Sequence, residues 1–244
     1  TQDIDRTIII PRDCTIEILN DGAESVDIHV GAGLEWDELV AWSVERGLWG
    51  LENLSLIPGK VGAAPVQNIG AYGTEAKACI TSVEMYCPES NTFLTLAAEH
   101  CGFGYRESVF KHTLKGRVII TSVLFRLSKV ATPLLNYGDV AAQVKGLGGA
   151  TLRNIREAIC TIRRTKLPDP AVTGNAGSFF NTPIVDNSTA QALLERYPDM
   201  PHYPAAEADM VKLAAGWLID QCGLKGYSKG NVGVHSRQAL VLIN

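Results

Sequence analysis

Apolar and polar positions alternate along the first part of the chain in a way that predicts β-strands. Residues 6–11, 14–19 and 25–33 carry β-branched residues at alternating or adjacent positions, and Asp, Asn and Gly separate them. This pattern is typical of strands joined by turns. Further runs of the same character are expected to be strands at residues 79–88, 91–96, 117–128 and 238–244.

Helical periodicity follows a different spacing and appears between these strands. Residues 34–50 carry apolar side chains amid acids and end at a glycine, so they predict a helix. A second helix is indicated by apolar residues at i, i+3, i+4 and i+7, namely Ile155, Ala158, Ile159 and Ile162. Two prolines in residues 166–170 end it and suggest a domain boundary there. Further helices are expected at 190–197 and 211–222, and the whole pattern predicts the α+β class.

Composition narrows the class of protein. The 244 residues suit one large or two ordinary domains, and 46% apolar with 20% charged residues is typical of a soluble globular protein. The net charge of −4 predicts neither a nucleic-acid nor an anionic membrane partner, and no signal peptide or membrane-spanning run is recognised. Six dispersed cysteines and five dispersed histidines lack metal-ligand spacing, so we expect no metal, no disulfide framework and a reducing cytoplasm.

A long glycine-rich loop at residues 50–73 is the first candidate for chemistry. Its glycines allow the backbone to approach a ligand closely, and its free N–H groups could hold a diphosphate. Its apolar residues Ile57, Val61, Val66 and Ile69 could line a flat ring. A well-packed buried loop explains the same pattern, so both interpretations stay open.

Cationic and phenolic residues provide the second candidate. Arg106 lies among aromatics and beside an acid, where it could bind a carboxylate or phosphate or form a structural ion pair. Other such groups lie near the expected boundary, at Tyr137, Arg163, Arg164, Lys166 and Lys225. They could hold an anionic ligand between two domains, or they could be a solvated basic helix end.

Ser178, in the segment Gly174 to Pro183, is the third candidate. The segment contains no GxSxG elbow, and no His–Asp partner can be assigned, so a hydrolase triad is not indicated. The hydroxyl could donate a proton to a strongly basic carbanion. It could equally satisfy the backbone of a turn.

Six segments of this chain, taken together, resemble the UDP-N-acetylenolpyruvoylglucosamine reductase family. They occur in the family's order and cover most of the chain from about Gly31 to Asn244. The segments are residues 50–73, 101–111, 165–170, 174–183, 212–226 and 238–244. The resemblance implies an FAD-dependent reductase of peptidoglycan synthesis. It would use NADPH to reduce the UDP-sugar substrate UDP-N-acetylglucosamine enolpyruvate to UDP-N-acetylmuramate, as a cytoplasmic monomer without nucleic-acid or membrane partners.

The same resemblance implies roles for individual residues. Arg106 matches the family's carboxylate-stabilising arginine, and Ser178 matches its proton-donating serine. Residues that match the flavin-binding positions are Gly59, Gly62, Gln67, Asn68, Gly70 and Gly73. Residues that match positions associated with the sugar nucleotide are Tyr137, Lys166, Lys225 and Gln238. Tyr203 resembles the mobile tyrosine of the subclass that carries an extra insertion.

The expected architecture is a two-lobed FAD-binding domain lacking its N-terminal lobe, followed by an incomplete α+β substrate-binding domain. Residues 1–16 would be a remnant of the first lobe, 17–167 the second lobe and 168–244 the substrate-binding domain. A glycine-rich turn before Thr1 and an acidic residue after Asn244 belong to the family's pattern, so we expect a chain truncated at both ends.

One internal position departs from the family. Asn181 and Thr182 stand where it has Lys-Asn, which affects one polar substrate contact. Two alternatives to the reductase stay open: a non-catalytic module that binds a sugar nucleotide, and another flavin oxidoreductase on the same scaffold.

Overall fold

The chain folds into two compact units, each of which is described by itself. The computed structural model describes residues 8–205 and 207–244, without the side chain of Ala176. The units are Thr1–Ile162 and Arg163–Asn244, and their boundary falls near the end of helix α3 (Leu152–Lys166). The predicted finer division at residues 16 and 167 stays a prediction, and residues 1–7 lie outside the described part of the chain.

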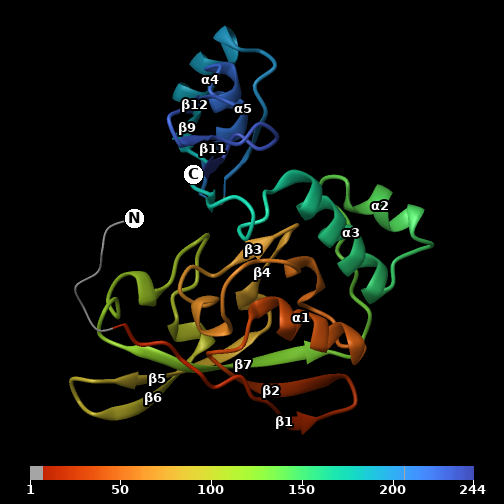
Figure 1. Cartoon of the computed structure of the whole chain (residues 1–244), viewed down its shortest axis with the longest axis vertical. Helices are drawn as coiled ribbons and strands as arrows, with labels where there is room; N and C mark the ends of the chain where they lie inside the picture. The colour runs from red at the N-terminus through yellow and green to blue at the C-terminus, as the bar shows by residue number, and fades with distance from the viewer. Residues whose placement is uncertain (1–7, 206) are drawn as a thin grey trace. The chain divides into compact units, whose positions relative to one another are not determined.

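A five-stranded antiparallel sheet forms the base of the first unit, with strand order β1-β2-β7-β5-β6 (Figure 1). Its strands are β1 (Ile16–Asp21), β2 (Ser25–Gly31), β5 (Ile80–Cys87), β6 (Thr92–Ala97) and β7 (Ile119–Ser128). These confirm the strands predicted from the alternating pattern. Residues 8–11 are the exception, because they form no strand. The run of isoleucines there has the local propensity, but no described strand pairs with it.

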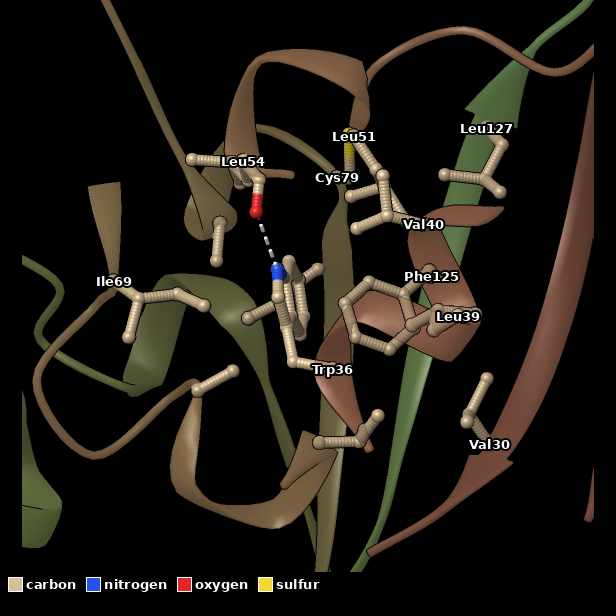
Figure 2. Close-up of a cluster of buried hydrophobic side chains, with 14 of the residues drawn as sticks. Val30, Trp36, Leu39, Val40, Leu51, Leu54, Ile69, Cys79, Phe125 and Leu127 are labelled. Carbon is tan, nitrogen blue, oxygen red and sulfur yellow. Dashed lines mark hydrogen bonds between the residues drawn. The ribbon is translucent and has the colours of Figure 1, made fainter. Parts of the chain in front are cut away.

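The core of the first unit lies between one face of this sheet and helix α1 (Trp36–Glu45). Every second residue of β2 points to this side, and Val26, Ile28 and Val30 are buried. Trp36 of α1 is fully buried beside Phe125 of β7, with ring centroids 6.0 Å apart. Its indole N–H donates to the carbonyl of Leu54 at 2.9 Å, the dashed line in Figure 2. The indole therefore ties the loop after α1 to the core, with its only polar group satisfied.

Two more helices belong wholly or mostly to this unit. In α3, Ile155, Ala158, Ile159 and Ile162 are all buried, which confirms the helix predicted from their spacing. The helix α2 (Val140–Gly146) was not predicted. It has only two turns, and its buried Val140 and Val144 are too few to show a helical period.

In the described part of the second unit lie two small sheets and the helices α4 and α5, so both units mix helices and strands as the α+β prediction requires. One sheet has the order β10-β11-β9 and the other β12-β13-β14-β8. The strands are β8 (Asn175–Ser178), β9 (Ile184–Asp186), β10 (His202–Pro204), β11 (Met210–Leu213), β12 (Ser228–Lys229), β13 (Val232–Val234) and β14 (Val241–Ile243). A small core gathers around Ala190, Met200 and Leu213.

The predicted elements of the second unit are partly confirmed. Helix α4 (Asn187–Arg196) and strand β14 agree with the sequence pattern, although β14 is shorter than predicted. The predicted helix at 211–222 is wrong in its first part, because Met210–Leu213 is the central strand β11 and α5 spans only Ala215–Gln221. Residues Met210–Leu213 form a strand rather than a helix because β11 pairs with β10 on one side and with β9 on the other.

Helix α4 begins at a well-made N-cap. The carboxylate of Asp186 accepts from the Ser188 hydroxyl and from the N–H of Thr189, which lowers its pKa to about 2. None of the helices in the described part of the chain combines the length and apolar character needed to cross a membrane.

Candidate functional site

The glycine-rich loop at residues 50–73 is anchored in the core of the first unit but exposes part of its backbone. Leu51, Leu54 and Val61 are completely buried. Gly59 and Gly73 are exposed, with φ of 113° and 86°, which only glycine adopts without strain. The loop ends in the hairpin of β3 (Gly70–Ala71) and β4 (Thr74–Glu75). The loop therefore combines the two structures expected from the sequence. Its buried residues pack in the core, and its exposed glycine turns leave backbone accessible to a ligand.

An apolar pocket of about 360 Å³ opens beside this loop. The loop contributes Gly62 and Val66 to its lining, and Phe110, Leu114 and Ile120 line it from other segments of the same unit. Lys60, which also lines the pocket, donates to the carbonyl of Gly33 at 2.7 Å and to the carboxylate of Glu35 at 2.8 Å. A pocket with apolar walls and few polar groups suits a flat aromatic ligand.

Arg106 lies against the end of the loop, at the β3–β4 hairpin. Its guanidinium donates to the carbonyls of Asn68 at 3.3 Å and Gly70 at 2.5 Å. A Cβ on Gly70 would lie 2.8 Å from an Nη atom of Arg106 and 2.8 Å from the main-chain carbonyl oxygen of Thr74, which cannot move aside easily, so this position requires glycine. These partners are main-chain carbonyls, whereas the neighbouring Glu107 accepts from Lys111 and His112. Within residues 8–205 and 207–244, the structure therefore does not support a structural ion pair as the explanation of Arg106.

Tyr137 meets the same hairpin from another segment. Its ring makes an edge-on contact with Tyr72, with centroids 6.0 Å apart. A Cβ on Gly73 would lie 3.9 Å from the Cβ of Tyr137. The hairpin therefore brings together three predicted groups that are far apart in sequence, namely the glycine loop, Arg106 and Tyr137. Their assigned roles stay predictions.

The remaining predicted residues belong to the second unit or to the end of α3. Ser178 is exposed at the end of β8, paired with Val241 of β14, so it lies in a strand rather than in a turn. Gln238 lies three residues before Val241 and accepts its N–H at 3.1 Å. Tyr203 of β10 is 55% exposed, and Lys225 pairs with Asp220 at 3.2 Å. Ser178 and Gln238 are therefore both linked to Val241 in the sheet of β8 and β14, whereas Tyr203 lies in the sheet of β9, β10 and β11.

Lys166 is exposed at the end of α3. The functional assignments of Lys166 and of Ser178, Tyr203, Lys225 and Gln238 stay predictions.

Among the described residues, no group of three or more His, Cys, Asp or Glu side chains is placed to hold a metal ion.

Sequence reasoning missed two acidic residues, Glu52 inside the loop and Glu75 just after it. Glu75, at the end of the hairpin, accepts from the side chain of Asn68 at 3.0 Å. Glu52 is 3% exposed, and burial raises the pKa of its carboxyl, although the N–H of Gly50 donates to it at 2.7 Å. No motif or spacing marks either residue, because each is defined by a contact with a turn that only the folded loop provides.

Two family models match this chain. Residues 4–95 match the FAD binding domain, and residues 169–244 match the C-terminal domain of UDP-N-acetylenolpyruvoylglucosamine reductase. Together they cover the glycine-rich loop and the segments that carry Ser178, Tyr203, Lys225 and Gln238.

Curated relatives carry the name UDP-N-acetylenolpyruvoylglucosamine reductase. The protein of Neisseria meningitidis is 54% identical over 89% of this chain and 63% of its own length. That of Chromobacterium violaceum is 51% identical over 94% of this chain and 68% of its own length. That of Salmonella typhimurium is 49% identical over 98% of this chain and 68% of its own length. The chain thus spans about two thirds of the length of these relatives.

A solved structure agrees with these sequence matches. The UDP-N-acetylenolpyruvylglucosamine reductase of Thermus caldophilus superposes with a TM-score of 0.60 at 26% identity, over 88% of this chain and 61% of that one. Membership of the subclass with the tyrosine insertion stays a prediction. On these matches, the chain belongs to the UDP-N-acetylenolpyruvoylglucosamine reductase family.

Proposed function

We propose that the protein carrying this chain is an FAD-dependent reductase that uses NADPH to convert UDP-N-acetylglucosamine enolpyruvate to UDP-N-acetylmuramate in peptidoglycan synthesis. The observation that carries the proposal is the fixed guanidinium of Arg106 at the end of a glycine-rich loop, within a chain of this family. The predictions of a cytoplasmic monomer belong to the same proposal.

The first unit has features that fit an FAD molecule. The apolar pocket of about 360 Å³ provides walls for a flat ring, and Gly62 of the loop lines it. At the exposed turns of the loop, Gly59 and Gly73 have no side chains, so a ligand can approach the backbone closely there. When bound, FAD supplies hydride transfer from NADPH to the enolpyruvyl double bond.

Arg106 is proposed to bind the substrate carboxylate. Hydride addition to the enolpyruvyl group leaves negative charge on the adjacent carbon and on the carboxylate, so a preorganised cation lowers the barrier. The two carbonyls that hold the guanidinium use only part of its N–H donors. The others can bind both oxygens of a carboxylate.

Ser178 is proposed to donate the proton that completes the reduction. Its hydroxyl is exposed on β8, and it needs no base partner because the strongly basic carbanion provides the driving force. Tyr137, Lys166, Tyr203, Lys225 and Gln238 are proposed to bind the sugar nucleotide.

Steady-state turnover tests the proposal. The longest form of the protein encoded by its gene should oxidise NADPH only when UDP-N-acetylglucosamine enolpyruvate is present, and UDP-N-acetylmuramate should form in equal amount. NADPH oxidation that does not depend on this substrate would favour another flavin oxidoreductase.

Calorimetry tests the non-catalytic alternative separately. We expect both FAD and the UDP-sugar to bind. Binding of the UDP-sugar without uptake of FAD would instead identify a sugar-nucleotide-binding module.

A further inference from the structure

We infer that Asn68 and Glu75 are positioning residues that hold the guanidinium of Arg106 in place. This inference rests on the proposed function, because it takes Arg106 as the group that binds the substrate carboxylate. It also gives Asn68 a part different from the cofactor contact expected from the sequence.

The side chain of Asn68 is completely enclosed by protein. The residue has 0% exposure, and its amide nitrogen donates to the carbonyl of Gly104 at 2.9 Å and to the carboxylate of Glu75 at 3.0 Å. Its amide oxygen accepts the N–H of Lys77 at 3.0 Å. Both amide hydrogens and the amide oxygen are therefore engaged by protein groups, which leaves no donor for a cofactor.

These bonds join the end of the glycine-rich loop to the segment that carries Arg106. The Asn68 side chain holds Gly104, and in return Arg106 donates to the carbonyl of Asn68. Gly104 and Glu107, on either side of Arg106, exchange backbone hydrogen bonds of 3.0 and 3.3 Å. The turn that presents Arg106 is thus closed on itself and fastened to the loop through Asn68.

The backbone at both residues is in the left-handed region. The φ of Asn68 is 42° and that of Arg106 is 58°. Residues other than glycine adopt this conformation at a cost, and they hold it only where surrounding contacts determine it. The amide of Asn68 makes such contacts, and Glu75, which also pairs with Lys77 at 3.3 Å, keeps that amide oriented.

The substitution Asn68→Asp tests this network with little change in shape. It removes both donated hydrogen bonds and sets a carboxylate against Glu75 and the carbonyl of Gly104. Asn53→Asp is the matched control, because Asn53 is also buried in the loop and donates to two carbonyls, those of Tyr72 and Leu134. Neither carbonyl belongs to the turn that presents Arg106.

The first measurement uses the full chain and does not depend on activity. In hydrogen exchange, the amides of Gly104 and Glu107 should exchange about 10-fold faster or more in Asn68→Asp, and at the wild-type rate in Asn53→Asp. Unchanged exchange in Asn68→Asp, or equal acceleration in both variants, would overturn the inference. If Asn68→Asp does not fold, Glu75→Ala removes one acceptor without adding charge and should accelerate the same amides to a smaller extent.

The second measurement uses the longest form of the protein and its two half-reactions. Asn68→Asp should slow reoxidation of the reduced flavin by the enolpyruvyl substrate about 100-fold, because a misplaced catalytic group loses that order of rate. Flavin reduction by NADPH should be unchanged. In an Arg106→Ala background, Asn68→Asp should cause no further slowing, because it acts through Arg106.

Full additivity with Arg106→Ala, or equal slowing of both half-reactions, would contradict a positioning role. A wild-type protein whose reduced flavin is not reoxidised by the substrate would instead contradict the proposed function. The exchange measurement would still decide whether Asn68 holds the turn.

Discussion

At the scale of single residues, the exposed hydroxyl of Ser178 carries the most direct prediction. Ser178→Ala should slow transfer to the enolpyruvyl substrate by about 10²–10⁴-fold, because a general acid contributes that much. Flavin reduction by NADPH should be unaffected, because it does not need this proton. Stopped-flow measurement of each half-reaction separates the two steps.

The matched control for this prediction is Ser228→Ala. Ser228 is an exposed strand serine in the sheet that contains Ser178, and it has no proposed role. Equal slowing of both half-reactions by Ser178→Ala would indicate a structural role for the hydroxyl.

The buried carboxyl of Glu52 predicts a pH dependence of stability. Burial raises its pKa in the folded state above the unfolded value of 4.5. The folded state therefore binds the proton more tightly, and the ionisation of Glu52 destabilises it as the pH rises from the unfolded pKa through the raised folded pKa, with no further change above that. Glu52→Gln should thus gain stability relative to wild type as the pH rises from about 4 to about 8.

Chemical unfolding followed by tryptophan fluorescence measures this effect, because Trp36, Trp42 and Trp49 lie in the first unit. Glu45→Gln, at the exposed end of α1, is the control and should keep the wild-type pH profile. If the difference in free energy of unfolding between Glu52→Gln and wild type stays constant or shrinks as the pH rises, the raised pKa of Glu52 would be refuted.

At the scale of elements, the β3–β4 hairpin requires glycine at position 70. In Gly70→Ala the new Cβ would lie 2.8 Å from both the guanidinium of Arg106 and the carbonyl of Thr74. We expect lower stability and displacement of Arg106, with a loss of activity on the enolpyruvyl substrate. Thermal unfolding and the second half-reaction measure these effects.

Gly146→Ala provides the control for this substitution. Gly146 is the last residue of α2 and has open space where a Cβ would be added. Alanine there should change stability by no more than about 1 kcal/mol, in the favourable direction. Similar losses in both variants would contradict a specific conflict at Gly70.

The elements also show how far the sequence determines the fold. Strands β2 and β7 and helices α1 and α3 were predictable, because each has enough residues to repeat its hydrophobic period against one core. Strand β11 was not, because Met210–Leu213 becomes a strand through pairing with β9 and β10. Helix α2 was missed because two turns carry too little pattern.

The candidate site was predictable to a similar extent. The six segments are enough to identify Arg106, Ser178 and the glycine-rich loop as candidates for chemistry. They did not identify the bond of Glu75 to Asn68 or the bond of Asn68 to the Arg106 turn, because these join residues 7 and 36 positions apart. Only the folded hairpin brings such groups together.

At the scale of the whole molecule, the two units have separate hydrophobic cores. Met200 is 2% exposed in the small core of the second unit, whereas Met85, also 2% exposed, belongs to the large core of the first. Met200→Ala should cost about 2–5 kcal/mol of stability. Faster hydrogen exchange should be confined to the second unit.

Met85→Ala is the reciprocal variant and should accelerate exchange in the first unit. Acceleration of both units by either single substitution would mean that the chain unfolds as one cooperative body, contrary to this prediction.

The central claim is that the protein is a flavin reductase that acts on an enolpyruvyl sugar nucleotide. The most direct test is to follow the flavin absorbance of the longest form of the protein in the absence of oxygen. NADPH should bleach the absorbance, and UDP-N-acetylglucosamine enolpyruvate should then restore it as UDP-N-acetylmuramate forms. A flavin that NADPH reduces but this substrate leaves reduced would contradict the claim.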